Sequence, residues 1–224
     1  MTAIEVDRRL LPVLRARFER VGRVRIVEGD ALHADLEGLF AGTAGPRKAV
    51  ANLPYNIAAP LLLRLLEPAL GFVRLVVTVQ REVAERVAAQ PATPSYGRLS
   101  VAVQYRAAPR IVARIPPGAF LPAPDVESAV LTLVPHGRPS VEVPDEAALF
   151  RVVAAGFGHR RKTLANALAR GLGLAPAAVE AACRAAGVDP RARAETLDLA
   201  AFAALTRALA GGTRKDSYDV GKER

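Results

Sequence analysis

The chain has 224 residues, of which 51% are hydrophobic and 24% charged, so it can bury a sizeable core and is not a disordered chain. Lys and Arg outnumber Asp and Glu by 31 to 22, and the net charge of +9 predicts an anionic partner such as nucleic acid or a membrane surface. The single cysteine, Cys183, excludes a disulfide framework within the chain, and three widely separated histidines argue against a metal site.

The first residues predict neither a signal peptide nor a membrane anchor. Carboxylates arrive at once, at Glu5 and Asp7, with no basic segment ahead of an apolar one. The apolar stretch 57–66 is interrupted by Pro60 and Arg64, and no window reaches the roughly 18 apolar residues of a spanning helix. We therefore expect a cytoplasmic protein without a membrane partner. No pattern indicates oligomerisation, which favours a monomer.

Short Val/Ile-rich runs alternate with helical patterns over the first part of the chain. This alternation predicts an α/β fold with a mostly parallel sheet covered by helices on both faces. The strands expected at 110–115 and 128–134 have no long crossover helix between them, so they are expected to pair as an antiparallel hairpin at one edge. The other strands are predicted at 3–6, 24–27, 49–52 and 73–79, and helices at 8–21, 57–66, 81–89 and 96–105.

The second part is rich in Ala and Leu and shows no convincing strand, which predicts a small all-helical domain. It follows a Pro-rich stretch, 135–144, that is typical of a linker. Residues 151–224 hold 13 Lys/Arg against 7 Asp/Glu, so most of the net positive charge lies here. We expect helices at 145–157, 160–172, 176–186 and 199–209, and domains at 1–138 and 139–210 with a disordered tail at 211–224.

Acidic residues follow the first two predicted strands, at the edge of the sheet where ligands of α/β folds bind. Glu5 can accept hydrogen bonds from two ribose hydroxyls, and Asp30 can accept one from an adenine amino group. Glu5 can also be a plain solvated carboxylate at a strand end, and Asp30 can also be a turn residue after Gly29.

The four residues after the third strand are more specific. The exocyclic amino group of adenine is a poor nucleophile, because its lone pair is delocalised into the ring. The Asn52 side chain and the Leu53 carbonyl can accept its two hydrogens, Pro54 fixes the backbone, and Tyr55 offers a face on which the base can stack. The alternative interpretation is a strand that ends in an ordinary Asn-x-Pro turn.

These segments resemble the small-subunit ribosomal RNA adenine dimethyltransferases, the KsgA family, in order over residues 3–209. NLPY at 52–55 resembles the catalytic motif of adenine-N6 methyltransferases that use S-adenosylmethionine. The resemblance implies a Rossmann-like methyltransferase sheet and dimethylation of two adjacent adenines near the 3′ end of small-subunit (16S) rRNA. The other matching segments are AIEVD (3–7), EGDAL (28–32), QREVAER (80–86), YGRLSV (96–101), AFLPAPDVESAV (119–130), FGHRRKTLAN (157–166) and RAETL (193–197).

The resemblance also implies roles for single residues. Glu5 corresponds to the residue that holds the cofactor ribose, Asp30 and Ala31 to the adenine site of the cofactor, and Asn52 lies near its methionine part. Phe120 corresponds to an aromatic that clamps the target adenine together with Tyr55, although a loop Phe can also plug the core.

A basic run at Arg160, Arg161 and Lys162 is predicted to open a helix of the second domain. Three adjacent cations can hold the phosphates of a folded RNA. An exposed helix also carries such a run without any ligand, so both interpretations stand.

The chain departs from the family pattern at its start. It has no Gly-x-Gly-x-Gly segment before Glu5, and the strand expected at the sheet centre is absent from it. A start placed at an internal codon, or a fragment, is favoured over a natural short form. Loss of a central strand leaves two unpaired edges, so we expect a chain of low stability with weak cofactor binding.

Two other functions stay open at this point. The first is a large-subunit rRNA adenine methyltransferase that confers antibiotic resistance, which shares the catalytic loop. The second is a non-catalytic RNA-binding or ribosome assembly factor. The segments YGRLS at 96–100 and RRKTL at 160–164 favour the small-subunit enzyme over the first of these.

Overall fold

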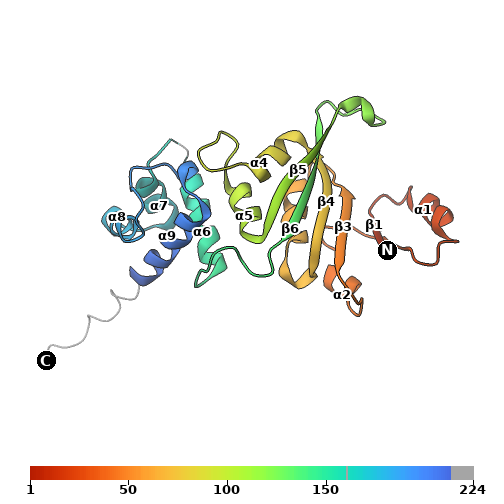
Figure 1. Cartoon of the computed structure of the whole chain (residues 1–224), viewed down its shortest axis with the longest axis horizontal. Coiled ribbons are helices and arrows are strands. Elements are labelled where there is room, and N and C mark those ends of the chain that lie inside the picture. Colours follow the sequence, from red (N-terminus) through yellow and green to blue (C-terminus); the bar gives the residue numbers. More distant parts are fainter. Residues whose placement is uncertain (160, 213–224) are drawn as a thin grey trace.

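The computed structural model describes residues 1–159 and 161–212. A sheet-containing part and a group of helices lie side by side along the longest axis of the molecule (Figure 1). The strands form two separate sheets, one with two strands and one with four. The fold is therefore α/β, as predicted, but its sheet is divided.

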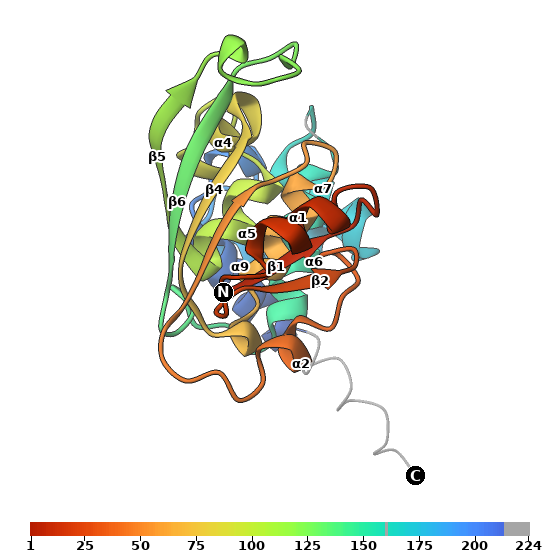
Figure 2. The same ribbon diagram turned by 90° about the vertical axis from the view of Figure 1, so that its right-hand side faces the viewer.

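The two-stranded sheet consists of β1 (Thr2–Glu5) and β2 (Arg25–Glu28), which run parallel with Ala3 opposite Ile26. Between them, α1 (Leu11–Phe18) is shorter than the predicted helix 8–21. Pro12 lies in the first turn of α1, where a helix has no use for the N–H that Pro lacks. This explains why α1 begins at Leu11 rather than at residue 8. Figure 2 looks onto these three elements, which lie beyond one edge of the larger sheet, formed by β3 (Arg47–Asn52).

The four-stranded sheet is mixed. β3 (Arg47–Asn52) and β4 (Phe72–Gln80) are parallel, whereas β6 (Ser128–Pro135) runs antiparallel to β4 and to β5 (Ala107–Ile115). The predicted hairpin at one edge is therefore confirmed. The prediction of a mostly parallel sheet is wrong for the molecule as a whole, because β6 lies between β4 and β5 and runs antiparallel to both.

Helices cover one face of the larger sheet. α3 (Ala58–Leu65), α4 (Arg81–Ala88) and α5 (Arg98–Arg106) pack over the buried side chains of β4 and β6, among them Leu75, Val77 and Leu131. On the other face of β3, Val50 is 82% exposed. The predicted cover on both faces is therefore wrong at β3, because β1, α1 and β2 lie beside this strand rather than over it (Figure 1).

The helical part contains α6 (Glu146–Phe157), α7 (Leu164–Leu172), α8 (Pro176–Ala185) and α9 (Leu199–Gly212). Asp145 caps α6, as its side chain accepts hydrogen bonds from the Ala147 and Ala148 amides. The core of this part surrounds the fully buried Phe202. The predicted boundary between domains at 138/139 stays a prediction.

α7 begins four residues later than the predicted helix 160–172. Its first amides donate to chain carbonyls elsewhere, Leu164 to Ala192 and Ala165 to Pro190, so a neighbouring turn satisfies the N-terminal donors that a helix leaves open. At the other end of the chain α9 reaches Gly212, so a disordered tail from residue 211 is wrong for residues 211 and 212, and residues 213–224 lie outside the described part.

Four short elements had no predicted counterpart. α2 (Leu36–Phe40) is capped by the Asp35 side chain, which accepts a hydrogen bond from the Gly38 amide. The other three are single 3₁₀ turns at Pro68–Leu70, Pro117–Ala119 and Ala194–Thr196. Such short turns carry too few residues to show a helical period in the sequence.

Candidate active site

The segment 52–55 forms a tight connection between β3 and α3. The Leu53 amide donates to the Thr78 carbonyl at 3.0 Å, which continues the pairing with β4 beyond the end of β3, and the Leu53 side chain is 3% exposed. The Ile57 amide then donates to the Pro54 carbonyl at 3.1 Å and closes the turn into the helix. The segment is thus anchored by a buried side chain and two backbone hydrogen bonds.

Two hydrogen-bond acceptors remain available at this connection. The Asn52 side chain is exposed, and neither it nor the Leu53 carbonyl has a partner in the part of the chain that the structure describes. Pro54 follows directly and adds no N–H donor that would compete for them. The two acceptors therefore face no protein donor and are free to bind an external amino group.

The Tyr55 side chain is hydrogen-bonded to a strand that lies far away in the sequence. Its phenol oxygen lies 2.5 Å from the Ser128 hydroxyl, across 73 positions of sequence. Ser128 is the first residue of β6 and is completely buried. Sequence reasoning did not assign Ser128 a role, although it lies within the matching segment 119–130.

Phe120 lies in the loop between β5 and β6, directly after the 3₁₀ turn Pro117–Ala119. It is half-buried and belongs to neither hydrophobic core, so it does not plug the core. The loop leads into Ser128 and thus ends beside Tyr55. Within residues 1–159 and 161–212 no ring contact joins Phe120 to Tyr55, so the structure brings together their segments and not their rings.

Glu5 lies at the carboxyl end of β1. One of its carboxylate oxygens, Oε1, accepts a hydrogen bond from the Asp7 amide at 2.8 Å, while Oε2 has no partner among the described residues. The free oxygen can accept from the hydroxyls of a sugar. The interpretation of Glu5 as a purely solvated carboxylate is therefore incomplete, since half of its acceptor capacity orders the chain that follows β1.

Asp30 organises the turn after β2. Its carboxylate accepts a hydrogen bond from the Leu32 amide at 2.9 Å and lies 2.8 Å from Nδ1 of His33. The Leu32 hydrogen bond, followed by the His33 contact, holds the pKa of Asp30 below its usual value. Asp30 is thus a turn residue, as one interpretation held. Its carboxylate is also an ionised hydrogen-bond acceptor.

Sequence reasoning missed Arg64, which links this turn to α3. Its guanidinium donates to the Ala31 carbonyl at 2.8 Å and also to the Ala34 carbonyl. The Ala31 amide itself has no acceptor among the described residues. An arginine within an apolar helix gives no sequence signal for this contact, because its acceptors are backbone carbonyls rather than particular side chains.

These groups fit the nucleoside part of S-adenosylmethionine. The set comprises a free carboxylate oxygen at Glu5, an ionised carboxylate at Asp30 beside a free N–H at Ala31, and a free side-chain amide at Asn52. Sugar hydroxyls need acceptors, and an adenine edge needs one acceptor and one donor, so the chemistry of the set matches both. They follow β1, β2 and β3, the three strands on either side of the division in the sheet.

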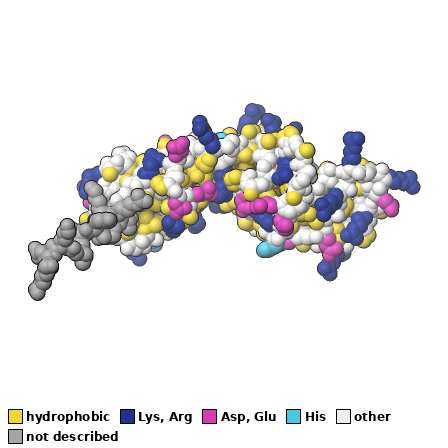
Figure 3. All heavy atoms as spheres, turned by 90° about the horizontal axis from the view of Figure 1, so that it is seen from below, with side chains coloured by type: hydrophobic (Ala, Val, Ile, Leu, Met, Phe, Trp, Pro, Cys, Tyr) yellow, Lys and Arg dark blue, Asp and Glu magenta, His cyan; other side chains and the backbone are white. Residues whose placement is uncertain are grey.

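The basic run lies in the helical part, directly before α7. Arg161 and Lys162 are exposed in the turn that precedes α7, so they do not open the helix as predicted, and Arg160 lies outside the described residues. In the face drawn in Figure 3, Lys and Arg side chains are spread over both parts of the molecule rather than gathered in one patch.

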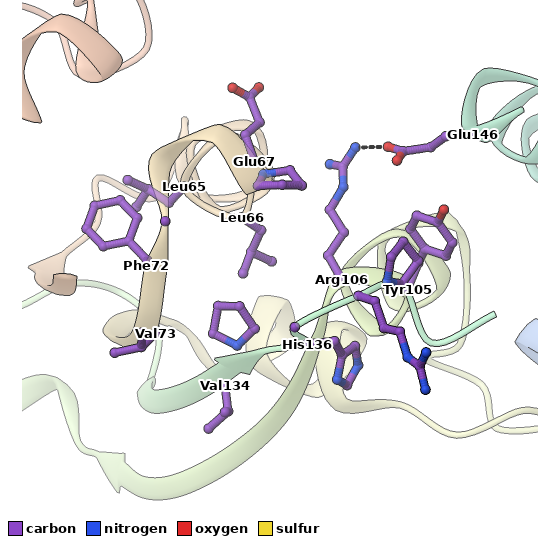
Figure 4. A pocket seen from close by; sticks show the side chains of 16 residues that line it. Leu65, Leu66, Glu67, Phe72, Val73, Tyr105, Arg106, Val134, His136 and Glu146 are labelled. Carbon is purple, nitrogen blue, oxygen red and sulfur yellow. Dashed lines mark hydrogen bonds and ion pairs between the residues drawn. The ribbon is translucent and has the colours of Figure 1, made fainter. Parts of the chain in front are cut away.

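A cavity of about 550 Å³ lies at the opposite end of the sheet from the 52–55 connection. Figure 4 shows its walls, with Leu65, Leu66 and Phe72 on one side and Arg106 with its ion-pair partner Glu146 on the other. None of the residues that the sequence singled out lines this cavity. Over the described residues there is no cluster of potential metal ligands and no helix long and apolar enough to cross a membrane.

Comparisons with known sequences give a consistent result. The family model for ribosomal RNA adenine dimethylase matches residues 1–210. Ribosomal RNA small subunit methyltransferase A of Geobacillus thermodenitrificans is 43% identical over 215 residues, which cover 93% of this chain and 73% of that protein. The proteins of the same name from Pelotomaculum thermopropionicum and Geobacter metallireducens are each 46% identical, over 94% and 93% of this chain and 75% and 77% of theirs.

Solved structures agree on the fold. A dimethyladenosine transferase from Plasmodium falciparum superposes with a TM-score of 0.73 at 22% identity, covering 95% of this chain and 82% of that one. The 23S rRNA methyltransferase ErmE superposes with a TM-score of 0.64 at 25% identity, covering 93% and 81%. The predicted methyltransferase sheet with a helical C-terminal part is thereby confirmed.

Proposed function

The chain belongs to the ribosomal RNA adenine dimethylase family, and we propose that the connection formed by Asn52, Leu53, Pro54 and Tyr55 is its catalytic site. The protein is an S-adenosylmethionine-dependent dimethyltransferase of adenine N6 groups in small-subunit rRNA. The observation that carries the site assignment is the pair of unpartnered acceptors, the Asn52 side chain and the Leu53 carbonyl, held at the carboxyl end of β3.

The two acceptors act on the amino group of the target adenine. The Asn52 side-chain oxygen and the Leu53 carbonyl oxygen each accept one N6 hydrogen, which draws the nitrogen lone pair out of conjugation with the ring. Because Asn52 is neutral, it positions and polarises the amino group rather than removing a proton. Tyr55 supplies the face on which the extruded base stacks, and Phe120 closes over the base from the β5–β6 loop.

Three groups hold the cofactor beside this base. Glu5 accepts from the ribose hydroxyls through its free oxygen, and Asp30 with the Ala31 amide reads the adenine edge. When bound, S-adenosylmethionine supplies an electrophilic methyl group on a sulfonium. We assign Asn52 to both sites, as the resemblance to the family implies, so that it orients the amino group toward that methyl.

The second methylation places a stricter demand on the same acceptors. After one transfer, in which the methylated nitrogen releases one proton to solvent water, the N6 nitrogen keeps a single hydrogen. Only one of the two hydrogen bonds, to Asn52 or to Leu53, can then form. The base must then be held chiefly by stacking on Tyr55. We infer that the aromatic residues contribute more to the second transfer than to the first.

The RNA is small-subunit rRNA, and its phosphates are held in part by the exposed basic run before α7. Arg161 and Lys162 lie free of salt bridges among the described residues, and Arg160 adjoins them in the sequence. Unpaired cations exchange counterions for phosphates without first breaking an internal ion pair. The protein works in the cytoplasm, where its ribosomal substrate is assembled. It acts as a monomer, and light scattering of the purified chain measures its mass in solution.

Of the alternatives, the comparisons favour the small-subunit enzyme. The relatives at 43% and 46% identity carry the small-subunit name, whereas the large-subunit methyltransferase is 25% identical. A non-catalytic assembly factor has no need for two free acceptors beside a buried anchor such as Leu53. The retained geometry of residues 52–55 therefore supports catalysis.

Transfer of a labelled methyl group tests the site assignment. Small ribosomal subunits that lack adenine dimethylation are incubated with the chain and labelled S-adenosylmethionine. We expect incorporation that falls at least about 100-fold in Asn52→Ala, the size of loss seen when one preorganised polar group is removed from a catalytic site. Equal incorporation by the wild type and the variant contradicts the assignment.

A further inference from the structure

We propose that Ser128 is a positioning residue that fixes the ring of Tyr55 for base stacking. This inference rests on the proposed function and adds a residue to it. The phenol oxygen of Tyr55 and the Ser128 hydroxyl are 2.5 Å apart, so the tip of the Tyr55 side chain is attached to β6 while its Cα belongs to the β3–α3 connection. A tyrosine held at both ends cannot tilt its ring freely.

Ser128 is itself held by a strand on each side. It stands opposite Gln80, the last residue of β4, and opposite Ile115, the last residue of β5, so two strands pair with it at the same edge of the sheet. It is completely buried, which leaves its hydroxyl no water with which to exchange. The anchor is therefore part of the sheet and not of a loop.

The residue before Ser128 adds a second restraint. The Arg81 amide donates to the Glu127 carbonyl at 2.9 Å, and the Arg81 guanidinium pairs with the Glu127 carboxylate at 2.8 Å. The start of α4 thus holds the chain directly ahead of β6. The position of the Ser128 hydroxyl is consequently set by β4, β5 and α4 together.

The arrangement couples the two aromatic sides of the target-base site. The loop that carries Phe120 runs directly into Ser128, and Ser128 bonds Tyr55. Both aromatic segments therefore share one fixed point, the start of β6. Loss of the bond leaves the RNA-binding cations untouched, so it affects the orientation of the bound base rather than the affinity for RNA.

The kinetic test compares Ser128→Ala with a matched control, Ser100→Ala. Ser100 is equally buried, and its hydroxyl also makes hydrogen bonds, accepting from the Gly97 amide and donating to the Arg86 carbonyl, but it has no contact with Tyr55. We expect Ser128→Ala to lower kcat about tenfold at an unchanged KM for RNA, because small misplacement of a reacting group costs this much or more. Ser100→Ala keeps its kcat, and Ser128→Thr, which retains the hydroxyl, recovers part of the loss.

A second variant removes the other half of the bond without changing the core. Tyr55→Phe keeps the ring and loses only the phenol oxygen. We expect the double variant Tyr55→Phe/Ser128→Ala to be no slower than the worse of the two single variants, since both remove the same hydrogen bond. If the kcat losses of the two single variants multiply in the double variant, the two residues act independently and the proposal is overturned. An equal kcat loss in Ser100→Ala and Ser128→Ala also overturns it.

The last measurement does not depend on turnover. An RNA hairpin carries fluorescent 2-aminopurine at the target adenine, and the chain has no Trp to mask its emission. Wild type and Ser100→Ala are expected to quench this emission on binding, and Ser128→Ala to quench it several-fold less at equal RNA occupancy. Failure of methyl transfer with this quenching pattern intact counts against the proposed function alone, whereas equal quenching by all three proteins overturns the role of Ser128.

Discussion

At the scale of single residues, the site depends on backbone groups that the sequence does not display. Leu53 contributes a carbonyl, Ala31 contributes an amide, and both are available only because neighbouring contacts satisfy other groups around them. Residues 52–55 could be recognised from their order alone, since Asn, Pro and Tyr each have a distinct chemical use there. Ser128 and Arg64 could not, because their partners lie 73 and about 30 positions away.

Arg64 yields the first prediction at this scale. Arg64→Ala removes the hydrogen bonds to the Ala31 and Ala34 carbonyls, so the turn that presents Asp30 and the Ala31 amide loses its attachment to α3. We expect the dissociation constant for S-adenosylmethionine to rise about tenfold, which corresponds to ~1.4 kcal/mol. Equilibrium dialysis with labelled cofactor measures this constant.

Arg47 provides the matched control. Its guanidinium also donates to two backbone carbonyls, those of Leu70 and Phe40 at 2.9 and 2.8 Å, but it lies away from the proposed cofactor site. Arg47→Ala is expected to lower thermal stability to a similar extent and to leave the cofactor dissociation constant unchanged. An equal loss of affinity in both variants indicates a general loss of structure and rules out the specific role of Arg64.

Asp30 yields a prediction about pH. Its pKa is lowered by the Leu32 hydrogen bond and then by the His33 contact, so the folded state favours the ionised carboxylate. This contribution is fully present above the usual pKa of 3.8 and is lost as the pH falls through the lowered value. Cofactor affinity is therefore expected to show no titration of Asp30 between about pH 5 and 8. An NMR titration of the Asp30 carboxyl carbon with a midpoint above 3.8 contradicts this account.

At the scale of elements, α5 connects the two parts of the molecule. Leu99 and Val103 on this helix pack into the core beneath the larger sheet, while Val101 and Tyr105 pack into the core of the helical part. The Pro-rich stretch 135–144 predicts a linker between the two parts. It could not reveal that an earlier helix is shared, because a nine-residue helix with apolar side chains on two faces has no single apolar stripe.

The turn before α7 yields a prediction for RNA binding. The double variant Arg161→Ala/Lys162→Ala removes two exposed cations and is expected to weaken RNA binding at every sequence tested. The slope of log K against log salt should fall by about two, one for each phosphate that the variant no longer neutralises. Filter binding of small-subunit rRNA at several salt concentrations measures both quantities.

Arg184 is the control for this experiment. It is an exposed cation of the same helical part, but it lies on α8 and pairs with Glu180 at 3.6 Å. Arg184→Ala should leave the salt slope unchanged. If it lowers the slope as much as the double variant does, the binding reflects the overall charge of the chain rather than the turn before α7.

At the scale of the whole molecule, the divided sheet is the main feature. β1 pairs only with β2 and β3 only with β4 among the described residues, so each has one edge without a partner. The resemblance to the family predicted both open edges, because it implies a strand between them that is absent from this sequence. The sequence pattern could not predict that β6 inserts between β4 and β5, since alternation of strands and helices does not encode strand order.

Hydrogen exchange tests the consequence of these edges. About half of the backbone N–H groups of β1 and β3 point toward the open side, because parallel strands bond alternately to each neighbour. These amides are expected to exchange rapidly, whereas the amides of β4, which is paired on both sides, exchange slowly. A uniform slow rate across β3 and β4, or a cooperative melt at high temperature with tight cofactor binding, contradicts the expected low stability.

The identity of the methylated nucleoside tests the central claim most directly. Small subunits lacking adenine dimethylation are treated with the chain and S-adenosylmethionine. Their rRNA is cut into oligonucleotides by a ribonuclease, and the modified oligonucleotides are sequenced by mass spectrometry. We predict N6,N6-dimethyladenosine at two adjacent positions near the 3′ end, and none with Asn52→Ala. Methyl groups found only on other nucleosides, or on large-subunit rRNA when both RNAs are offered, contradict the central claim. That claim is that the connection at residues 52–55 dimethylates small-subunit adenines.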